Sequence, residues 1–178
     1  MAFRLVWGVV GSRYARFASF APTPAKLRAY LKGQWRGLGH NPLGAFSVFA
    51  LLGLLAAQAT TGLFSNDDIS FTGPLFELVN EDLASRLTGW HRQFATALYV
   101  LLGLHVLAIA FYARVKKDKL VKPMVTGWKD VAPGEVDEPA PEQRGRATSL
   151  ITFVAALAVA LAAVYAASGA PFKKAAAS

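Results

Sequence analysis

Three apolar stretches, at residues 45–64, 89–112 and 149–167, are each long enough to cross a lipid bilayer as a helix. A spanning helix needs about 20 predominantly apolar residues, and it must satisfy its own backbone hydrogen bonds because the bilayer core contains no water. Only 17% of the residues are charged, whereas 54% are hydrophobic. We therefore predict an all-α membrane protein that forms a transmembrane helical bundle with three spanning helices.

The chain opens with a further apolar stretch, residues 3–10, which contains Arg4 and is too short to span. It lacks the features of a signal peptide, so we interpret it as an N-terminal helix remnant. Residues 25–35 combine basic and apolar side chains, as in a short amphipathic helix on an anionic membrane surface, although an ordinary polar connector is the alternative. Residues 131–141, rich in Pro and Glu, are predicted to form a loop.

Charge differs between the segments that flank these spans. Residues 1–44 contain seven basic residues and no acidic one, whereas residues 65–88 contain five acidic residues against Arg86. Basic residues return after the second span. The positive-inside rule therefore predicts that residues 1–44 and 113–148 are cytoplasmic, and that the loop 65–88 and the C-terminus lie outside. The net charge of +8 is explained by this pattern, so membrane lipid is an expected partner and nucleic acid is not.

The sequence contains no cysteine, which excludes disulfides, iron-sulfur clusters and covalently attached c-type haem. Any metal must be bound by histidine or carboxylate. No catalytic nucleophile with a matching base and no phosphate-binding glycine loop is present, so hydrolytic and phosphoryl-transfer chemistry is not supported.

Two histidines, His91 and His105, lie within the second span. Ionisable residues are costly inside a membrane, so they indicate a functional site. A spacing of 14 residues is nearly four helical turns, which places the two side chains roughly 40° apart on one face and about 21 Å apart along the axis. That distance is too long for one metal ion but suits two haems, one near each membrane face. For either histidine alone, a hydrogen bond at a helix-helix contact remains the alternative.

Small residues at four-residue spacing on the first span, Gly53, Ala57 and Thr61, would allow close approach of a macrocycle or of another helix.

Five stretches of the chain resemble, in the same order, the bacterial cytochrome b-561 family of di-haem membrane cytochromes, which is related to the cytochrome b subunits of nickel-iron hydrogenases. The stretches are FRLVWGVVGSRYARF, GHNPLGA, TGLF, LTGWH with His105 beyond it, and LVKPMVTG. The resemblance implies a four-helix bundle in a bacterial inner membrane. The acidic loop and the C-terminus, which the positive-inside rule places outside, would then lie in the periplasm. It also implies two b-type haems, with His91 and His105 as axial ligands from the last core helix. Residues 1–130 would then form a partial cytochrome b-type domain, 131–148 a cytoplasmic loop, and 149–178 an extra helix and tail.

The family's first two helices, which carry the opposing histidine ligands, have no counterpart in this sequence. We therefore expect those ligands to come from the missing helices or from a partner subunit. His40 and Arg4 are additional candidates for cofactor binding. His40 could meet a haem propionate or a quinone headgroup, or simply start a helix; Arg4 could pair with a propionate or serve as a positive-inside anchor.

The leading hypothesis for function is electron transfer between a redox partner, such as a c-type cytochrome or a hydrogenase, and quinone. A quinone-coupled oxidoreductase acting on a small substrate such as superoxide is a second hypothesis, since some family members imply that activity. A haem-free membrane anchor subunit is the third.

Overall fold

The computed structural model describes residues 1–35, 41–116, 126 and 146–175, and most of them are helical. The longer helices are α1 (Ala2–Val10), α3 (Pro24–Leu31), α4 (Pro42–Leu63), α5 (Glu81–Arg114) and α7 (Arg146–Ala167). The shorter ones are η1 (Arg13–Ala15), α2 (Phe17–Phe20), η2 (Phe76–Leu78) and α8 (Ala170–Ala175).

Three of the described helices are long and apolar enough to cross a membrane: α4, α5 and residues Ser149–Ala167 of α7. The prediction of an all-α membrane protein with three spanning helices is therefore confirmed. The N-terminal helix α1, by contrast, has nine residues. At about 1.5 Å per residue this is far shorter than the hydrocarbon core of a bilayer.

Side-chain caps fix where the main helices begin. The Asn41 side chain accepts a hydrogen bond from the backbone N–H of Gly44 at 2.7 Å, and Pro42 occupies the first turn of α4. Asn80 caps α5 in the same way through the N–H of Leu83, at 2.9 Å. Such caps satisfy backbone donors that have no partner within the helix. Both caps therefore anchor the first turns of the two helices that carry the candidate site.

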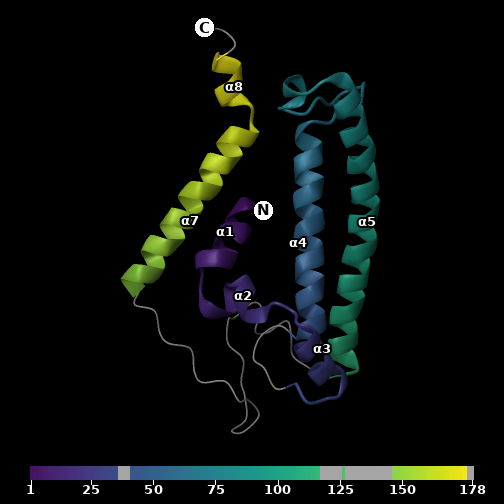
Figure 1. Ribbon diagram of the computed structural model, residues 1–178, viewed down its shortest axis with the longest axis vertical. Coiled ribbons are helices and arrows are strands. Elements are labelled where there is room, and N and C mark those ends of the chain that lie inside the picture. The colour runs from purple at the N-terminus through teal and green to yellow at the C-terminus, as the bar shows by residue number, and fades with distance from the viewer. Residues whose placement is uncertain (36–40, 117–125, 127–145, 176–178) are drawn as a thin grey trace.

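The helices associate in two pairs (Figure 1): α4 packs antiparallel against α5, and α1 packs against α7. Aromatic rings hold the second pair together, with the Phe153 ring 5.6 Å from that of Phe3 and 5.9 Å from that of Trp7. On the other side, the rings of Phe17 and Phe20 each lie 5.6 Å from that of Phe49 on α4. The segment from α1 to α2 thus contacts both α7 and α4.

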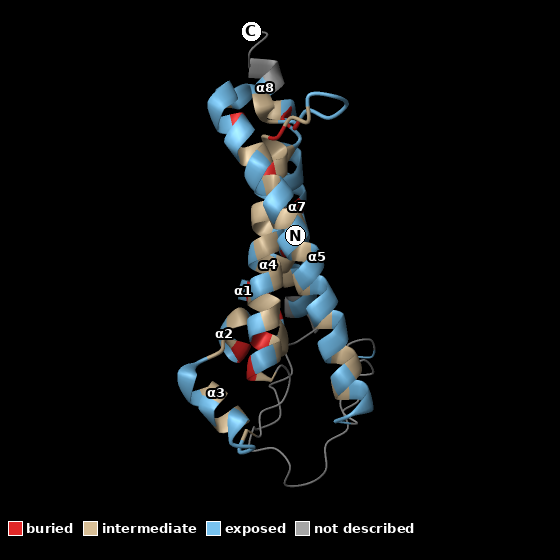
Figure 2. Cartoon of the chain, turned by 90° about the vertical axis from the view of Figure 1, so that its right-hand side faces the viewer, coloured by how far each residue is buried: buried red, intermediate tan, exposed pale blue. Residues whose placement is uncertain are grey.

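Few residues are buried (Figure 2), and most of those are small. Small residues allow membrane helices to pack closely. The buried apolar residues among those described are Phe20, Ala45, Ala84, Ala156 and Ala160. Large apolar side chains cover the outside instead, such as Tyr99 at 75% and Leu107 at 66% exposure on α5. An apolar exterior of this kind suits contact with lipid or with further helices.

The connection between α4 and α5 folds back onto the end of α4. The N–H of Leu75 donates to the carbonyl of Leu63 at 2.9 Å, and the N–H of Gly73 donates to that of Ser65 at 2.7 Å. A β-carbon on Gly73 would lie 2.4 Å from the Leu63 carbonyl oxygen, so only glycine allows this close approach. The connection therefore fixes α4 and α5 relative to each other at this end.

Asp67 organises the tip of the same connection. Its Oδ1 accepts hydrogen bonds from the backbone N–H groups of Phe71 at 2.8 Å, Ser70 at 2.9 Å and Ile69 at 3.1 Å. These bonds, led by the one from Phe71, lower the pKa of Asp67 to about 2 because they favour the charged carboxylate. The turn is therefore held by a carboxylate that stays ionised well into the acid range.

Several boundaries differ from those predicted. The loop 65–88 is shorter than expected because α5 begins at Glu81, where the Asn80 cap and two acidic residues favour a helix start outside the apolar span. The amphipathic helix is limited to α3, whose Tyr30 hydroxyl is hydrogen-bonded to the Tyr112 hydroxyl near the end of α5. The predicted loop at 131–141 lies outside the described residues.

Candidate functional site

Both histidines of the second span, His91 and His105, hydrogen-bond to side chains of α4. Fourteen residues separate them on α5, and fourteen residues also separate their α4 partners, Ser47 and Thr61. Because the two helices run antiparallel, equal spacings bring both pairs into register. The one-face placement predicted from the spacing of the histidines is therefore present, and the face is turned towards α4.

His105 is held through one ring nitrogen. Its Nδ1 lies 2.8 Å from the Ser47 hydroxyl oxygen, and the imidazole is only half-buried. Among the described residues no hydrogen bond reaches its Nε2. A partner on one nitrogen that leaves the other open is the arrangement that orients histidine for metal binding.

The ring of His91 is held through both nitrogens. The backbone carbonyl oxygen of Gln58, which only accepts hydrogen bonds, lies 3.0 Å from Nδ1, so Nδ1 carries the proton and donates. The Thr61 hydroxyl lies 3.2 Å from the same nitrogen and donates its own proton to the Ala57 carbonyl. Nε2 is therefore the unprotonated nitrogen, whose lone pair can accept a hydrogen bond. The Gln58 side-chain amide donates to it at 3.0 Å.

Close packing of His91 against α4 depends on Gly62. A β-carbon at this position would lie 2.8 Å from Cε1 and 3.2 Å from Nδ1 of the ring. Carbon atoms do not approach so closely without displacement, so a larger residue would push the ring away from its hydrogen-bond partners. Gly62 thus provides the space in which the imidazole lies.

The other two candidates from the sequence are not brought to the histidines by any described contact. Arg4 donates from Nη1 to the Ala15 carbonyl at 3.2 Å, and its guanidinium lies 4.8 Å from the centre of the Phe17 ring. These contacts join α1 to the segment that follows it. His40 lies outside the described residues.

Sequence reasoning did not select Ser47 and Gln58, and it selected Thr61 only for its small size. Two signals could have found them. Polar side chains within a spanning segment need partners, so Ser47 and Gln58 pointed to a polar contact inside the membrane. In addition, the spacing of Ser47 and Thr61 equals that of the histidines. Of the small stripe, Thr61 is buried, whereas a β-carbon on Gly53 would meet no atom within 4 Å.

This donor set fits haem iron. Haem takes neutral imidazole as an axial ligand, and each ring has an Nδ1 hydrogen-bond partner on α4 that leaves Nε2 to face a ligand. At His105 the nitrogen is open, whereas at His91 the amide of Gln58 must first move aside. Through Nε2 each ring would hold one haem iron, and haem would supply the redox centre.

Three membrane-length helices, two of which are joined through the imidazoles of His91 and His105, define a helical membrane protein. The chain belongs to the prokaryotic cytochrome b561 family, whose model matches residues 1–127. No curated protein and no solved structure matched the chain in the same comparisons.

Membership confirms the family suggested by the sequence motifs. It implies haem b as the cofactor and electron transfer within a membrane as the activity, in concert with a redox partner. The matched region includes α1, α4 and α5, and therefore both histidines and all their described partners.

Proposed function

We propose that His91 and His105 each supply one axial ligand to a haem b, and that the chain carries electrons across the membrane through two such haems. The observation that carries this proposal is the pair of imidazoles on α5, 14 residues apart and both turned towards α4, in a chain of the cytochrome b561 family. Haem, when bound, supplies a centre that accepts and releases single electrons.

The polar residues of α4 orient the two rings. Ser47 would accept from Nδ1 of His105, and the Gln58 carbonyl accepts from Nδ1 of His91. Both bonds hold the tautomer in which Nε2 has the lone pair that a metal needs, and they fix the orientation of the ring. About 21 Å along the helix axis separates the two rings, so each haem would lie towards a different face of the bilayer.

The opposing axial ligands would come from helices outside this set or from a partner subunit. The sequence has three histidines, and two haems with two histidine ligands each would require four. The exposed apolar side chains of α5 offer a surface on which such helices could pack. We regard α7, which packs on α1, as an additional helix beyond the cytochrome core of residues 1–130.

The proposed orientation in the bacterial inner membrane rests on the charges at the two ends of the α4–α5 pair. Acidic residues gather at the connection and at the start of α5, whereas basic residues gather near α3 and before it; the acidic residues are Asp67, Asp68, Glu77, Glu81 and Asp82. The positive-inside rule then assigns the connection and α8, which lies at the same end (Figure 1), to the periplasm. A c-type cytochrome or a hydrogenase would meet the chain there, and quinone would exchange electrons within the membrane.

The test is to replace each histidine in a haem-loaded assembly and measure the optical spectrum and the haem content. We expect His91→Ala and His105→Ala each to remove one haem and leave the other, because the two sites are separated by about 21 Å. Loss of both haems from either substitution, in a protein that still inserts and folds, would contradict two independent sites.

A further inference from the structure

The side-chain amide of Gln58 lies where iron would have to approach His91. It donates to Nε2 at 3.0 Å, and Nε2 is the nitrogen whose lone pair is free. One lone pair cannot serve a hydrogen-bond donor and a metal at the same time. The amide and the iron therefore compete for the same atom.

We propose that Gln58 occupies the iron-binding nitrogen of His91 in the haem-free protein and is displaced when haem enters, so that it lowers the affinity of this site for haem. Gln58 is thus a positioning residue, since it acts through His91. This inference rests on the proposed role of His91 as a haem ligand.

The environment explains why an amide is placed there. An imidazole nitrogen without a partner is costly in the low dielectric of a membrane, because no water can satisfy it. The hydrogen bond from Gln58 removes this cost at Nε2 of His91. It therefore stabilises the α4–α5 pair before the cofactor arrives.

The same side chain is also ready to leave. Its Oε1 is buried and accepts no hydrogen bond from the described residues. A buried amide oxygen without a donor is unfavourable. This cost at the oxygen partly offsets the free energy that the hydrogen bond at the amide nitrogen contributes. Rotation of the side chain away from His91 would break one hydrogen bond. It would also move the oxygen out of the buried position in which it has no donor. The net barrier to haem entry is thus smaller than that of a fully satisfied pair.

His105 provides an internal comparison. Its partner Ser47 contacts Nδ1, and no described residue donates to Nε2. Loss of the Ser47 hydroxyl would remove an orienting contact, whereas loss of the Gln58 amide would remove a competing one. The two α4 side chains should therefore influence haem affinity in opposite directions.

The experiment is a haem titration of the full chain in detergent, monitored by the Soret band. Each titration uses a variant that keeps only one of the two histidines, His91 or His105. In a His105→Ala background we expect Gln58→Leu to bind haem roughly three- to ten-fold more tightly, the range that a single hydrogen bond accounts for. In a His91→Ala background we expect Ser47→Ala to bind haem more weakly. Opposite changes in haem affinity in the two variants would exclude a general loosening of α4 and α5 as the cause.

A second measurement reads the haem-free state directly. The sequence contains three histidines, so ¹⁵N-histidine labelling gives a spectrum of few signals that His91→Ala assigns. Replacement of Gln58 by leucine should move the Nε2 signal of His91 and leave that of His105 in place. Gln58→Met, which keeps the length of the side chain, serves as the second variant if leucine prevents insertion.

The outcomes separate this inference from the proposed function. Unchanged or weaker haem binding in Gln58→Leu, with haem still bound through His91, would overturn the role of Gln58 and leave the ligand assignment intact. Absence of haem binding through either histidine, also in an assembly that supplies the opposing ligands, would overturn both.

Discussion

His91 lies so close to Gly62 that a β-carbon on the glycine would come within 2.8 Å of its ring carbon Cε1. The two residues belong to neighbouring spanning helices, so this contact sets how near α5 comes to α4 at the end where the connection joins them. The contact leads directly to a test of the site.

Gly62→Ala should weaken haem binding at His91 by roughly ten-fold or more, because the added methyl group displaces the ring from the Gln58 carbonyl that orients it. Haem binding at His105 should not change. Gly53→Ala on the same helix is the matched control, since a β-carbon there meets no atom within 4 Å. Equal loss of haem in both variants, measured by titration, would show that the effect comes from α4 as a whole and not from the contact with His91.

Topology can be measured with single cysteines, because the natural sequence has none. Ile69 at the tip of the α4–α5 connection is 92% exposed, and Lys32 after α3 is also exposed. We expect a membrane-impermeant maleimide to label Ile69→Cys from the periplasmic side and Lys32→Cys only after the membrane is permeabilised. The reverse pattern would invert the proposed orientation.

Asp67 should make the connection sensitive to strong acid. Its pKa falls from 3.8 to about 2 on folding, so its contribution to stability is complete above pH 3.8 and is lost as the pH falls through about 2. Amide hydrogen exchange at Ile69, Ser70 and Phe71 should therefore accelerate between about pH 4 and pH 2, beyond its intrinsic pH dependence.

Asp67→Asn should remove this pH dependence and raise exchange at neutral pH, because a neutral amide accepts hydrogen bonds less strongly than a carboxylate. Asp68→Asn is the control, since the Asp68 carboxylate accepts no hydrogen bond from the described residues. If both variants behave alike, the turn does not depend on the Asp67 carboxylate.

The number of histidines limits haem ligation. A single copy of the 178-residue chain, with three histidines, should not form two haem sites with two histidine ligands each. Haem per chain, the low-spin optical signature and the mass of the purified particle test this limit together. Two low-spin bis-histidine haems on a monomer would contradict it.

The sequence was sufficient to predict the spanning helices and the histidine pair, because hydropathy and helical spacing are local properties of one segment. The partners of the histidines were not predictable in this way. Which α4 residue meets His91 depends on the register between two helices, and that register follows from the fold of the connection around Gly73 and Leu75. A helix start outside the apolar region was missed for a related reason, since Asn80 and its acidic neighbours add nothing to a hydropathy profile.

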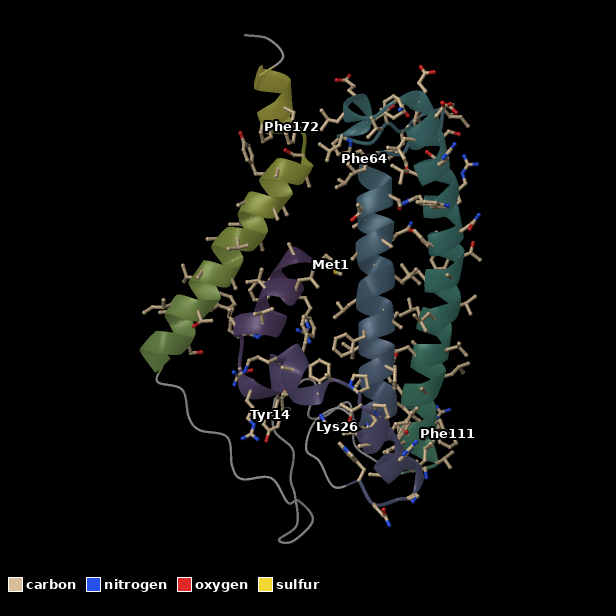
Figure 3. The ribbon with its side chains drawn as sticks, viewed as in Figure 1. Met1, Tyr14, Lys26, Phe64, Phe111 and Phe172 are labelled. Carbon is tan, nitrogen blue, oxygen red and sulfur yellow. The ribbon has the colours of Figure 1, made fainter. Side chains whose placement is uncertain are left out.

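The two ends of α5 are joined to different parts of the chain (Figure 3). Phe64 lies at the end where the connection folds back on α4, whereas Phe111 lies at the opposite end of α5, near α3. At that second end the hydroxyl of Tyr112 meets that of Tyr30, so α3 is joined to α5. No pattern within either segment predicts this contact, because 82 residues separate the two tyrosines.

The equal spacing of Ser47 and Thr61 on one helix and of the histidines on the other constrains how these helices can change during evolution. A single inserted or deleted residue between Ser47 and Thr61 would turn one half of α4 by about 100° against the other half, so only one histidine could keep its partner. A compensating change of length would have to arise in α5 at the same time. Descendants of this chain should therefore diverge here by substitution, and the distance between the two imidazoles should be inherited unchanged.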